Sequence, residues 1–166
     1  MPSLSIKCQS NNCYLTCEEN ECPVIFPSQL DFFCDGEKII NQGLRCDCIV
    51  AFIKPESAGG LTIEIYSIEL KSIRNPNRAE KLLESLREKC RNCLEWAENE
   101  ALRKLKGSIA NITISTYCIN VIPSDVFNHT ATLIRKRVIN LKPNNITHVK
   151  IIPCNGKLTD KPLFEI

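Results

Sequence analysis

The sequence has few of the residues that mark common enzyme classes. Aromatic residues make up 6% of the chain, and the only histidines are His129 and His148. A cysteine nucleophile would need a nearby histidine base, so cysteine hydrolase chemistry is not expected. The net charge is only +2, which is too small to announce a nucleic-acid partner, although a local groove can still be positive.

Long apolar stretches are also missing. No segment approaches the roughly 20 apolar residues of a membrane span, and residues 1–7 lack the apolar core of a secretory signal. We therefore expect an intracellular, cytoplasmic protein without a membrane partner. The chain has 166 residues, a length that suits one compact domain.

Cysteine, in contrast, is abundant, with 11 residues. Such a number is unusual in a reducing cytosol, and the recognised exception is the disulfide-rich interior of hyperthermophiles. Heavy use of isoleucine fits that setting, so we hypothesise a thermophilic, archaeal type of source. Five cysteines lie in residues 1–34, which we interpret as a cysteine-rich N-terminal segment, a short helix or irregular cap, preceding a core over residues 35–166.

The state of the cysteines is open from spacing alone. Cys8, Cys13, Cys17 and Cys22 could bind zinc, but the spacing lacks the tight pairs of typical zinc sites, so disulfides fit better. Cys90 and Cys93 fall on the apolar stripe of a helix and are expected to be structural, as packing residues or in a bridge to the N-terminal segment. An iron–sulfur cluster and free thiols are the remaining alternatives. Cys46 and Cys48 are expected to face away from Asp47 and to be packing residues.

Periodicity predicts the order of elements in the core. Alternating and β-branched stretches predict strands at 38–40, 44–53, 61–71, 110–122 and 148–153. Apolar residues at three- and four-residue steps predict a helix over 76–106, and a second helix follows Pro123 to about residue 140. Strands joined by long helices favour an α/β fold, a central mixed sheet flanked by helices.

Three charged residues carry the functional prediction. Asp47 lies within an apolar strand, and Glu69 and Lys71 lie at the end of the next, on one face and about 7 Å apart. Buried carboxylates are unfavourable unless they are paired or bind a metal. Mg²⁺ (or Mn²⁺) would satisfy Asp47 and Glu69, with the backbone carbonyl of Leu70 as a further ligand. Such an ion activates water and polarises a phosphate, and Lys71 could assist the attack.

Asp47 followed by Glu69-Leu70-Lys71 resembles the PD-(D/E)xK nucleases, which include restriction endonucleases and archaeal Holliday-junction resolvases. The resemblance covers roughly residues 35–120 and implies a restriction-endonuclease-like fold. It also implies a Mg-dependent deoxyribonuclease acting on DNA phosphodiester bonds, with Asp47, Glu69 and Lys71 as catalytic residues. A homodimer is plausible by resemblance only. In place of the family's usual proline, Cys46 precedes Asp47, and Glu18, Glu19, Glu21 or Glu37 could supply its additional acidic ligand.

Two alternatives remain. Glu69 and Lys71 could form an ordinary surface ion pair, which contributes little to stability. Arg74 and Arg78 follow the motif and could bind DNA phosphates, or they could lie on the solvated face of the helix. A non-catalytic module with a nuclease-like fold, binding nucleic acid or a protein, is therefore the alternative function.

Overall fold

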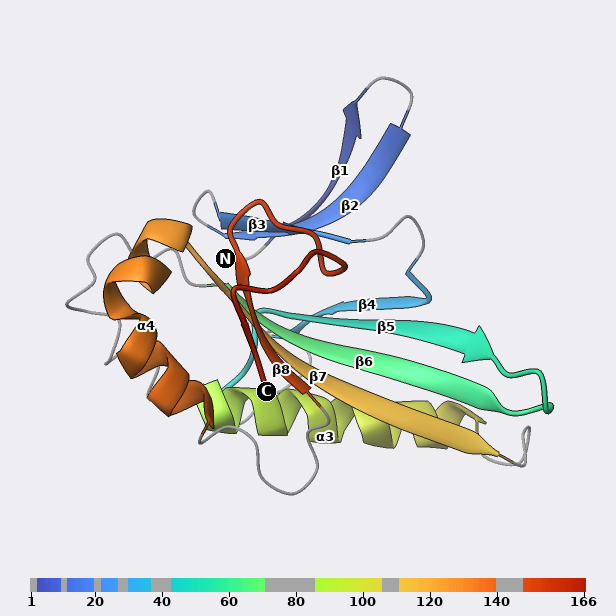
Figure 1. The fold of residues 1–166 in the computed structure, drawn as a ribbon. Helices are drawn as coiled ribbons and strands as arrows, with labels where there is room; N and C mark the ends of the chain where they lie inside the picture. The colour runs from blue at the N-terminus through green and yellow to red at the C-terminus, as the bar shows by residue number, and fades with distance from the viewer. Residues whose placement is uncertain are drawn as a thin grey trace.

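The fold contains two β-sheets and two long helices in the computed structural model, which describes residues 3–9, 12–19, 22–26, 30–36, 43–70, 86–105, 111–139 and 148–166 (Figure 1). The smaller sheet has three strands: β1 (Ser3–Gln9), β2 (Asn12–Glu19) and β3 (Cys22–Ile25). The larger sheet has six: β4 (Phe32–Asp35), β5 (Cys48–Pro55), β6 (Leu61–Leu70), β7 (Ile112–Ile122), β8 (His148–Pro153) and β9 (Phe164–Glu165).

The six-stranded sheet is mixed, and its strands follow one another in chain order. β4, β5 and β6 pair antiparallel, whereas β6, β7 and β8 run parallel. Parallel neighbours need crossover connections, and α3 (Leu86–Leu105) and α4 (Ser124–Ile139) lie between β6, β7 and β8 in the chain. The predicted α/β class with a mixed sheet is therefore confirmed, and both described helices contribute to the core on the same face of that sheet.

Element boundaries agree with the periodicity in some places and not in others. The strand at 148–153 is found as predicted, and β6 covers the described part of the strand predicted at 61–71. Two strands of the larger sheet, β4 and β9, were not expected. Predictions that concern the strand at 38–40, the start of the first helix, Lys71, Arg74 and Arg78 lie outside the described residues.

The N-terminal segment is a sheet, so the prediction of a short helix or irregular cap is wrong. β1 and β2 form an antiparallel hairpin in which Cys8 lies opposite Cys13, and β2 pairs with β3. The hairpin projects from the body of the molecule (Figure 1). The sequence does carry a strand signal here, because residues 3–9 (SLSIKCQ) alternate polar and apolar residues, and the prediction overlooked it. β4, which crosses the predicted boundary at residue 34, pairs with β5 of the larger sheet.

Each face of the six-stranded sheet has its own core. On one face, α3 packs Leu86, Cys90, Cys93, Leu94 and Ala97 against odd-numbered residues of β5 and β6, and α4 adds Val126 and Phe127. On the other face, β2 and β3 pack Cys17, Cys22 and Val24 against the alternate residues of the same strands. The sheet is therefore covered on both sides, with α3 beneath it and the small sheet above it in Figure 1.

Beyond the small sheet, the upper face carries a row of rings from four strands. Tyr66, Tyr117 and His148 are direct cross-strand partners and stack face to face, with ring centroids 4.4 and 5.0 Å apart. Phe52 meets Tyr66 edge-on at 5.6 Å. Burial and the carboxylate of Glu64 raise the pKa of Tyr66. Because the rings stack on one another, the row joins strands instead of presenting open ring faces.

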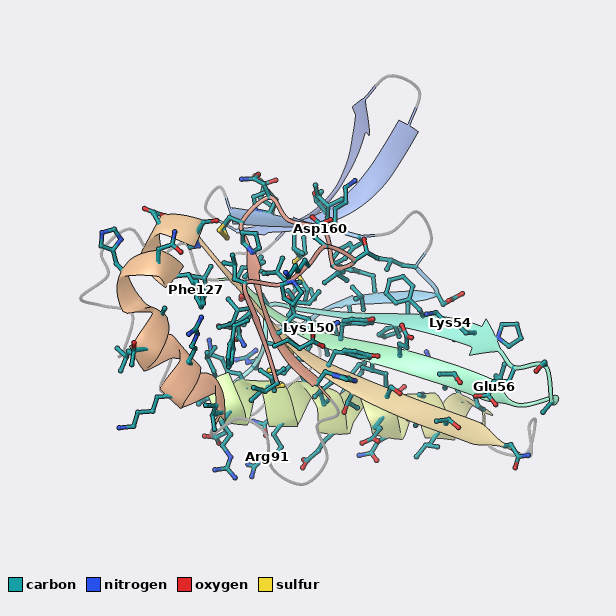
Figure 2. All side chains as sticks on the ribbon, in the orientation of Figure 1. Lys54, Glu56, Arg91, Phe127, Lys150 and Asp160 are labelled. Carbon is teal, nitrogen blue, oxygen red and sulfur yellow. A yellow bond between two sulfur atoms is a disulfide. The ribbon has the colours of Figure 1, made fainter. Side chains whose placement is uncertain are left out.

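Basic side chains lie on both the sheet and α3. Lys54 and Lys150 lie over the upper face of the sheet, whereas Arg91 of α3 points away from it (Figure 2). Four described basic residues of α3 are exposed: Arg87, Arg91, Arg103 and Lys104. Neither of the helices that the structure describes is long and apolar enough to cross a membrane.

Candidate functional site

Asp47 lies at a bend immediately before β5, so its predicted position inside a strand is wrong. Its N–H donates to the carbonyl of Ile68 at 3.0 Å, and its Oδ2 accepts a hydrogen bond from the N–H of Leu70 at 2.6 Å. The Asp47 carboxylate thus accepts a hydrogen bond that, in a regular ladder, a backbone carbonyl of the neighbouring strand would accept. It is 7% exposed, and this bond offsets part of the cost of its burial.

Two disulfides hold the residues on either side of Asp47. Cys46 is bonded to Cys93 of α3, and Cys48 is bonded to Cys17 of the small sheet. In a regular strand, residues 46 and 48 would face the same side. Here they reach opposite layers, which requires the backbone to turn at Asp47. Both cysteines were expected to be packing residues, and their disulfides fix the carboxylate between the two layers.

Gly36 contributes to the same arrangement. Its N–H donates to the carbonyl of Asp47 at 3.0 Å. A Cβ at this position would overlap the backbone oxygen of Cys46. The end of β4 can therefore approach the segment before β5 only because residue 36 has no side chain.

Glu69 lies near the end of β6 on the face that packs against α3, in step with Ile63 and Ile65. It is 4% exposed. Its Oε1 accepts a hydrogen bond from Nζ of Lys89 on α3 at 2.5 Å, and the Lys89 side chain is 20% exposed. The structure thus pairs Glu69 with a lysine from the following helix. The surface ion pair considered from the sequence does not describe this buried carboxylate.

Asp47 and Glu69 lie beside each other. In the antiparallel register, Cys48 lies opposite Ile68. Asp47 precedes Cys48 and Glu69 follows Ile68, so these two residues form the next pair along the two segments. Leu70, whose carbonyl was predicted as a metal ligand, donates its N–H to Asp47, and its side chain packs in the opposite core. On the other side of Glu69, the parallel register places Asn120 of β7. Three oxygen-bearing side chains therefore form a row across adjacent segments, called the acidic row below.

Two thiols lie next to the acidic row. Cys90 and Cys118 are reduced and buried. Burial, followed by the hydrogen bond with Cys118, raises the pKa of Cys90 well above its usual range. A protonated thiol is a poor metal ligand. Among the described residues, no group of three or more His, Cys, Asp and Glu side chains is arranged to hold a metal ion.

Two cysteines of the N-terminal segment form disulfides with distant parts of the chain. Cys17 is bonded to Cys48, and Cys22 to Cys154, which are 31 and 132 residues away in sequence. Cys93 bonds Cys46 of the core, and so does not bridge to the N-terminal segment. These three pairs support the disulfide interpretation over shared zinc ligation by the N-terminal cysteines, because a disulfide sulfur is no longer a thiolate ligand.

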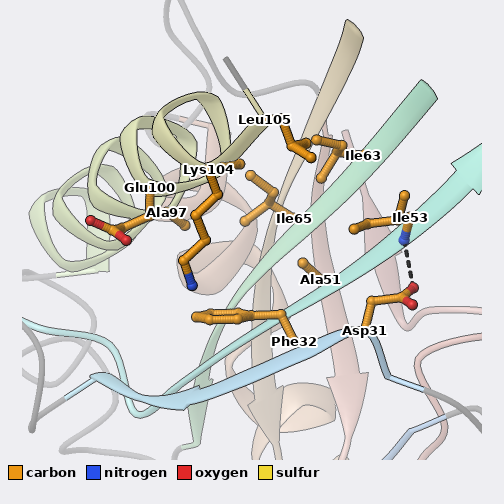
Figure 3. A pocket seen from close by; sticks show the side chains of 11 residues that line it. Asp31, Phe32, Ala51, Ile53, Ile63, Ile65, Ala97, Glu100, Lys104 and Leu105 are labelled. Atoms are coloured by element: carbon orange, nitrogen blue, oxygen red, sulfur yellow. Dashed lines mark hydrogen bonds between the residues drawn. The ribbon is translucent and has the colours of Figure 1, made fainter. Parts of the chain in front are cut away.

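A hollow lies at the other end of α3. It has a volume of about 200 Å³ and lies between α3, β4, β5 and β6 (Figure 3). Its lining is mostly apolar and includes Phe32, Ile63 and Ala101. Lys104 reaches over the ring of Phe32, with Nζ 5.4 Å from the centroid. Asp31 is tied back, since its Oδ2 accepts the N–H of Ile53 at 2.7 Å.

Lys89 and Asn120 are site residues that sequence reasoning missed. Lys89 carried a usable signal, because it lies three residues after Leu86 and four before Cys93, both on the buried stripe of α3. Asn120 interrupts an apolar run in β7, which was a usable signal, because an amide in a buried strand needs a reason. The row offers carboxylate and amide oxygens, the donors that hard divalent cations prefer.

No family model, curated protein or solved structure matches this chain.

Proposed function

We propose that the protein is a metal-dependent nuclease that hydrolyses DNA phosphodiester bonds. The observation that carries the proposal is the acidic row: two buried carboxylates, Asp47 and Glu69, lie side by side on adjoining segments, and a lysine contacts one of them. Asn120 supports it, because its amide is 1% exposed and has no hydrogen-bond partner in the part of the chain that the structure describes.

Each residue has a definable part in this proposal. Asp47 and Glu69 would hold a Mg²⁺ or Mn²⁺ ion, and the Leu70 N–H keeps Asp47 in place through Oδ2. When bound, such an ion polarises the phosphate and lowers the pKa of coordinated water. Lys89 compensates the charge of Glu69 in a site with little water, where an ion pair is strong. Lys71 stays the proposed lysine that assists water, and Arg74 and Arg78 the proposed phosphate contacts.

The restriction-endonuclease-like arrangement is part of the proposal. It is supported by the antiparallel pairing of β5 with β6, the helix after β6, and the parallel return through β7. DNA is the proposed substrate because the resemblance to the PD-(D/E)xK nucleases implies it. A cation between the two carboxylates would supply the charge stabilisation that phosphodiester hydrolysis needs.

The test is cleavage of linear, branched and single-stranded DNA with Mg²⁺ or Mn²⁺. We expect Asp47→Asn and Lys71→Ala to lower the cleavage rate by roughly a hundredfold or more. Asp31→Asn is a matched control, because Asp31 also accepts a backbone N–H through a carboxylate oxygen but lies at the hollow. The proposal fails if the wild-type protein cuts none of these DNAs with either ion, or if Asp47→Asn and Lys71→Ala cut as fast as Asp31→Asn.

One observation favours the non-catalytic module as a second candidate. Both carboxylates already have protein partners, Asp47 with the Leu70 N–H and Glu69 with Lys89, so the row could be structural. Calorimetric titration with Mn²⁺ separates the two functions. A nuclease site shows binding that Asp47→Asn weakens, whereas a structural row shows no binding that depends on Asp47.

A further inference from the structure

Asn120 differs from the other buried polar residues around it. Its side chain is 1% exposed, and within the described part of the chain neither Oδ1 nor Nδ2 has a hydrogen-bond partner. Ser67 and Thr116, buried polar residues of the same layer, both have polar or electrostatic partners. An amide offers two N–H donors and a carbonyl acceptor, and most buried amides use them. Asn120 is therefore an exception that needs a physical reason.

The place of Asn120 in the sheet supplies that reason. In the parallel register it lies directly beside Glu69 on one side and Ile151 on the other. Ile151 and Cys118 belong to the core under α3, so Asn120 also faces α3, as Glu69 does. Neighbouring strands are about 4.8 Å apart, so the amide lies within reach of the oxygens of the acidic row.

An apolar residue would fill this position at no polar cost. The adjacent alternate residues, Cys118 and Ile122, are both apolar and buried. An amide held there without partners destabilises the folded protein. Such an arrangement is retained where the polar group has a use outside the folding of the chain itself. A carbonyl oxygen beside a carboxylate is suited to a hard cation, since Mn²⁺ and Ca²⁺ accept amide oxygens as ligands.

We propose that Oδ1 of Asn120 is the third protein ligand of the divalent cation, beside Asp47 and Glu69. This rests on the proposed function, because it assumes that the acidic row binds a cation. It assigns the additional ligand to β7, whereas the sequence pointed to Glu18, Glu19, Glu21 or Glu37. The site then has two carboxylates and one neutral oxygen, from the segment before β5 and from the C-terminal parts of β6 and β7.

The experiment is Mn²⁺ titration of the full chain without DNA, by calorimetry and by the loss of the free Mn²⁺ spectrum in electron paramagnetic resonance. The variants are Asn120→Leu, which has a similar size and no oxygen, and Asn120→Asp, which keeps the oxygen and adds a charge. Thr116→Val is the matched control, a buried polar change on the same face of β7. Thermal unfolding of the metal-free proteins is measured in parallel.

We expect Asn120→Leu to weaken Mn²⁺ binding by roughly tenfold or more, Asn120→Asp to strengthen it, and Thr116→Val to leave it unchanged. Without metal, Asn120→Leu should raise the unfolding temperature by about 2–4 °C, because it removes a buried amide without partners.

The failures are distinguishable. If Asn120→Leu binds Mn²⁺ as tightly as wild type while Glu69→Gln does not, the cation site stands and Asn120 is not its ligand. If wild type binds no Mn²⁺, the cation site itself is wrong and the inference falls with it. Should Asn120→Leu not fold, weaker or unchanged binding by Asn120→Asp overturns the assignment.

Discussion

The two ends of the layer between α3 and the sheet are built from the same elements and differ in what they bury. Near the start of α3, the layer holds the acidic row, with Lys89 on Glu69 and Cys93 bonded to Cys46. Near its end, the layer holds an apolar hollow of about 200 Å³ beside Lys104. The buried carboxylates thus lie where a disulfide and an ion pair hold the surrounding segments, whereas the apolar end contains unfilled space.

Removal of the disulfide at the acidic row should have the largest effect. Cys46 and Cys93 close a loop with a sequence separation of 47. The double variant Cys46→Ser/Cys93→Ser should therefore lose about 4 kcal/mol of unfolding free energy on the loop-entropy estimate. Denaturant unfolding measures this loss, with Cys34→Ser, a reduced cysteine, as control.

The same variant tests where the disulfide acts. Amide hydrogen exchange should rise more at Asp47 and at the start of α3 than at the end of α3 beside the hollow. Equal acceleration at both ends would show that the disulfide does not hold the acidic row in particular.

The lysines of α3 offer a matched pair. Lys89→Met takes a partner from the buried carboxylate of Glu69 and should lower the unfolding free energy by about 3 kcal/mol. Lys104→Met removes an exposed lysine over Phe32 and should cost less than about 1 kcal/mol. Chemical denaturation of both variants compares them. Similar losses would mean that Lys89 does not stabilise the buried charge.

The hollow can be filled to sharpen the contrast. Ala101 lines it, and Ala101→Leu should add about 1 kcal/mol of unfolding free energy by burying further apolar surface. Ala101→Ser, which keeps the size of the side chain, is the control and should give no gain. Thermal and denaturant unfolding measure both variants, and destabilisation by leucine would show that the hollow cannot accept it.

The reduced cysteines at the two ends of the layer should differ in their reactivity. Cys34 is half-buried beside Lys104 and Glu100, whereas Cys90 and Cys118 are buried next to the acidic row. Iodoacetamide followed by mass spectrometry at pH 8 should label Cys34 in the native protein and the other two only after unfolding. Labelling of all three at one rate would contradict this difference in burial.

The pH dependence of Cys34 follows from the same surroundings. Burial raises the pKa of Cys34 above its ordinary value of 9.0, and the nearby Lys104 partly opposes this. The thiolate is the reactive form, so labelling should keep accelerating as the pH rises past 9.0. Lys104→Met removes the opposing cation and should slow labelling at pH 8.

The sequence predicted the fold class well and the contacts of the candidate site only in part. β-branched alternation in β6 and the apolar stripe of α3 predicted their elements, because local periodicity reflects burial on one face. The pairing of Asp47 with Glu69 followed from the expected hairpin. The N-terminal strands were missed although β1 alternates polar and apolar residues. The bend at Asp47 was missed because it depends on a hydrogen bond to Leu70.

By itself, the sequence determined four strands of the larger sheet (β5, β6, β7 and β8), the two amphipathic helices and the presence of carboxylates within apolar surroundings, because these follow from residue type and spacing along the chain. Only the tertiary structure decided which lysine meets Glu69, which cysteines pair, and that Asn120 joins the row. These contacts join residues that are tens of positions apart. Their choice depends on strand register and helix packing, which no local pattern encodes.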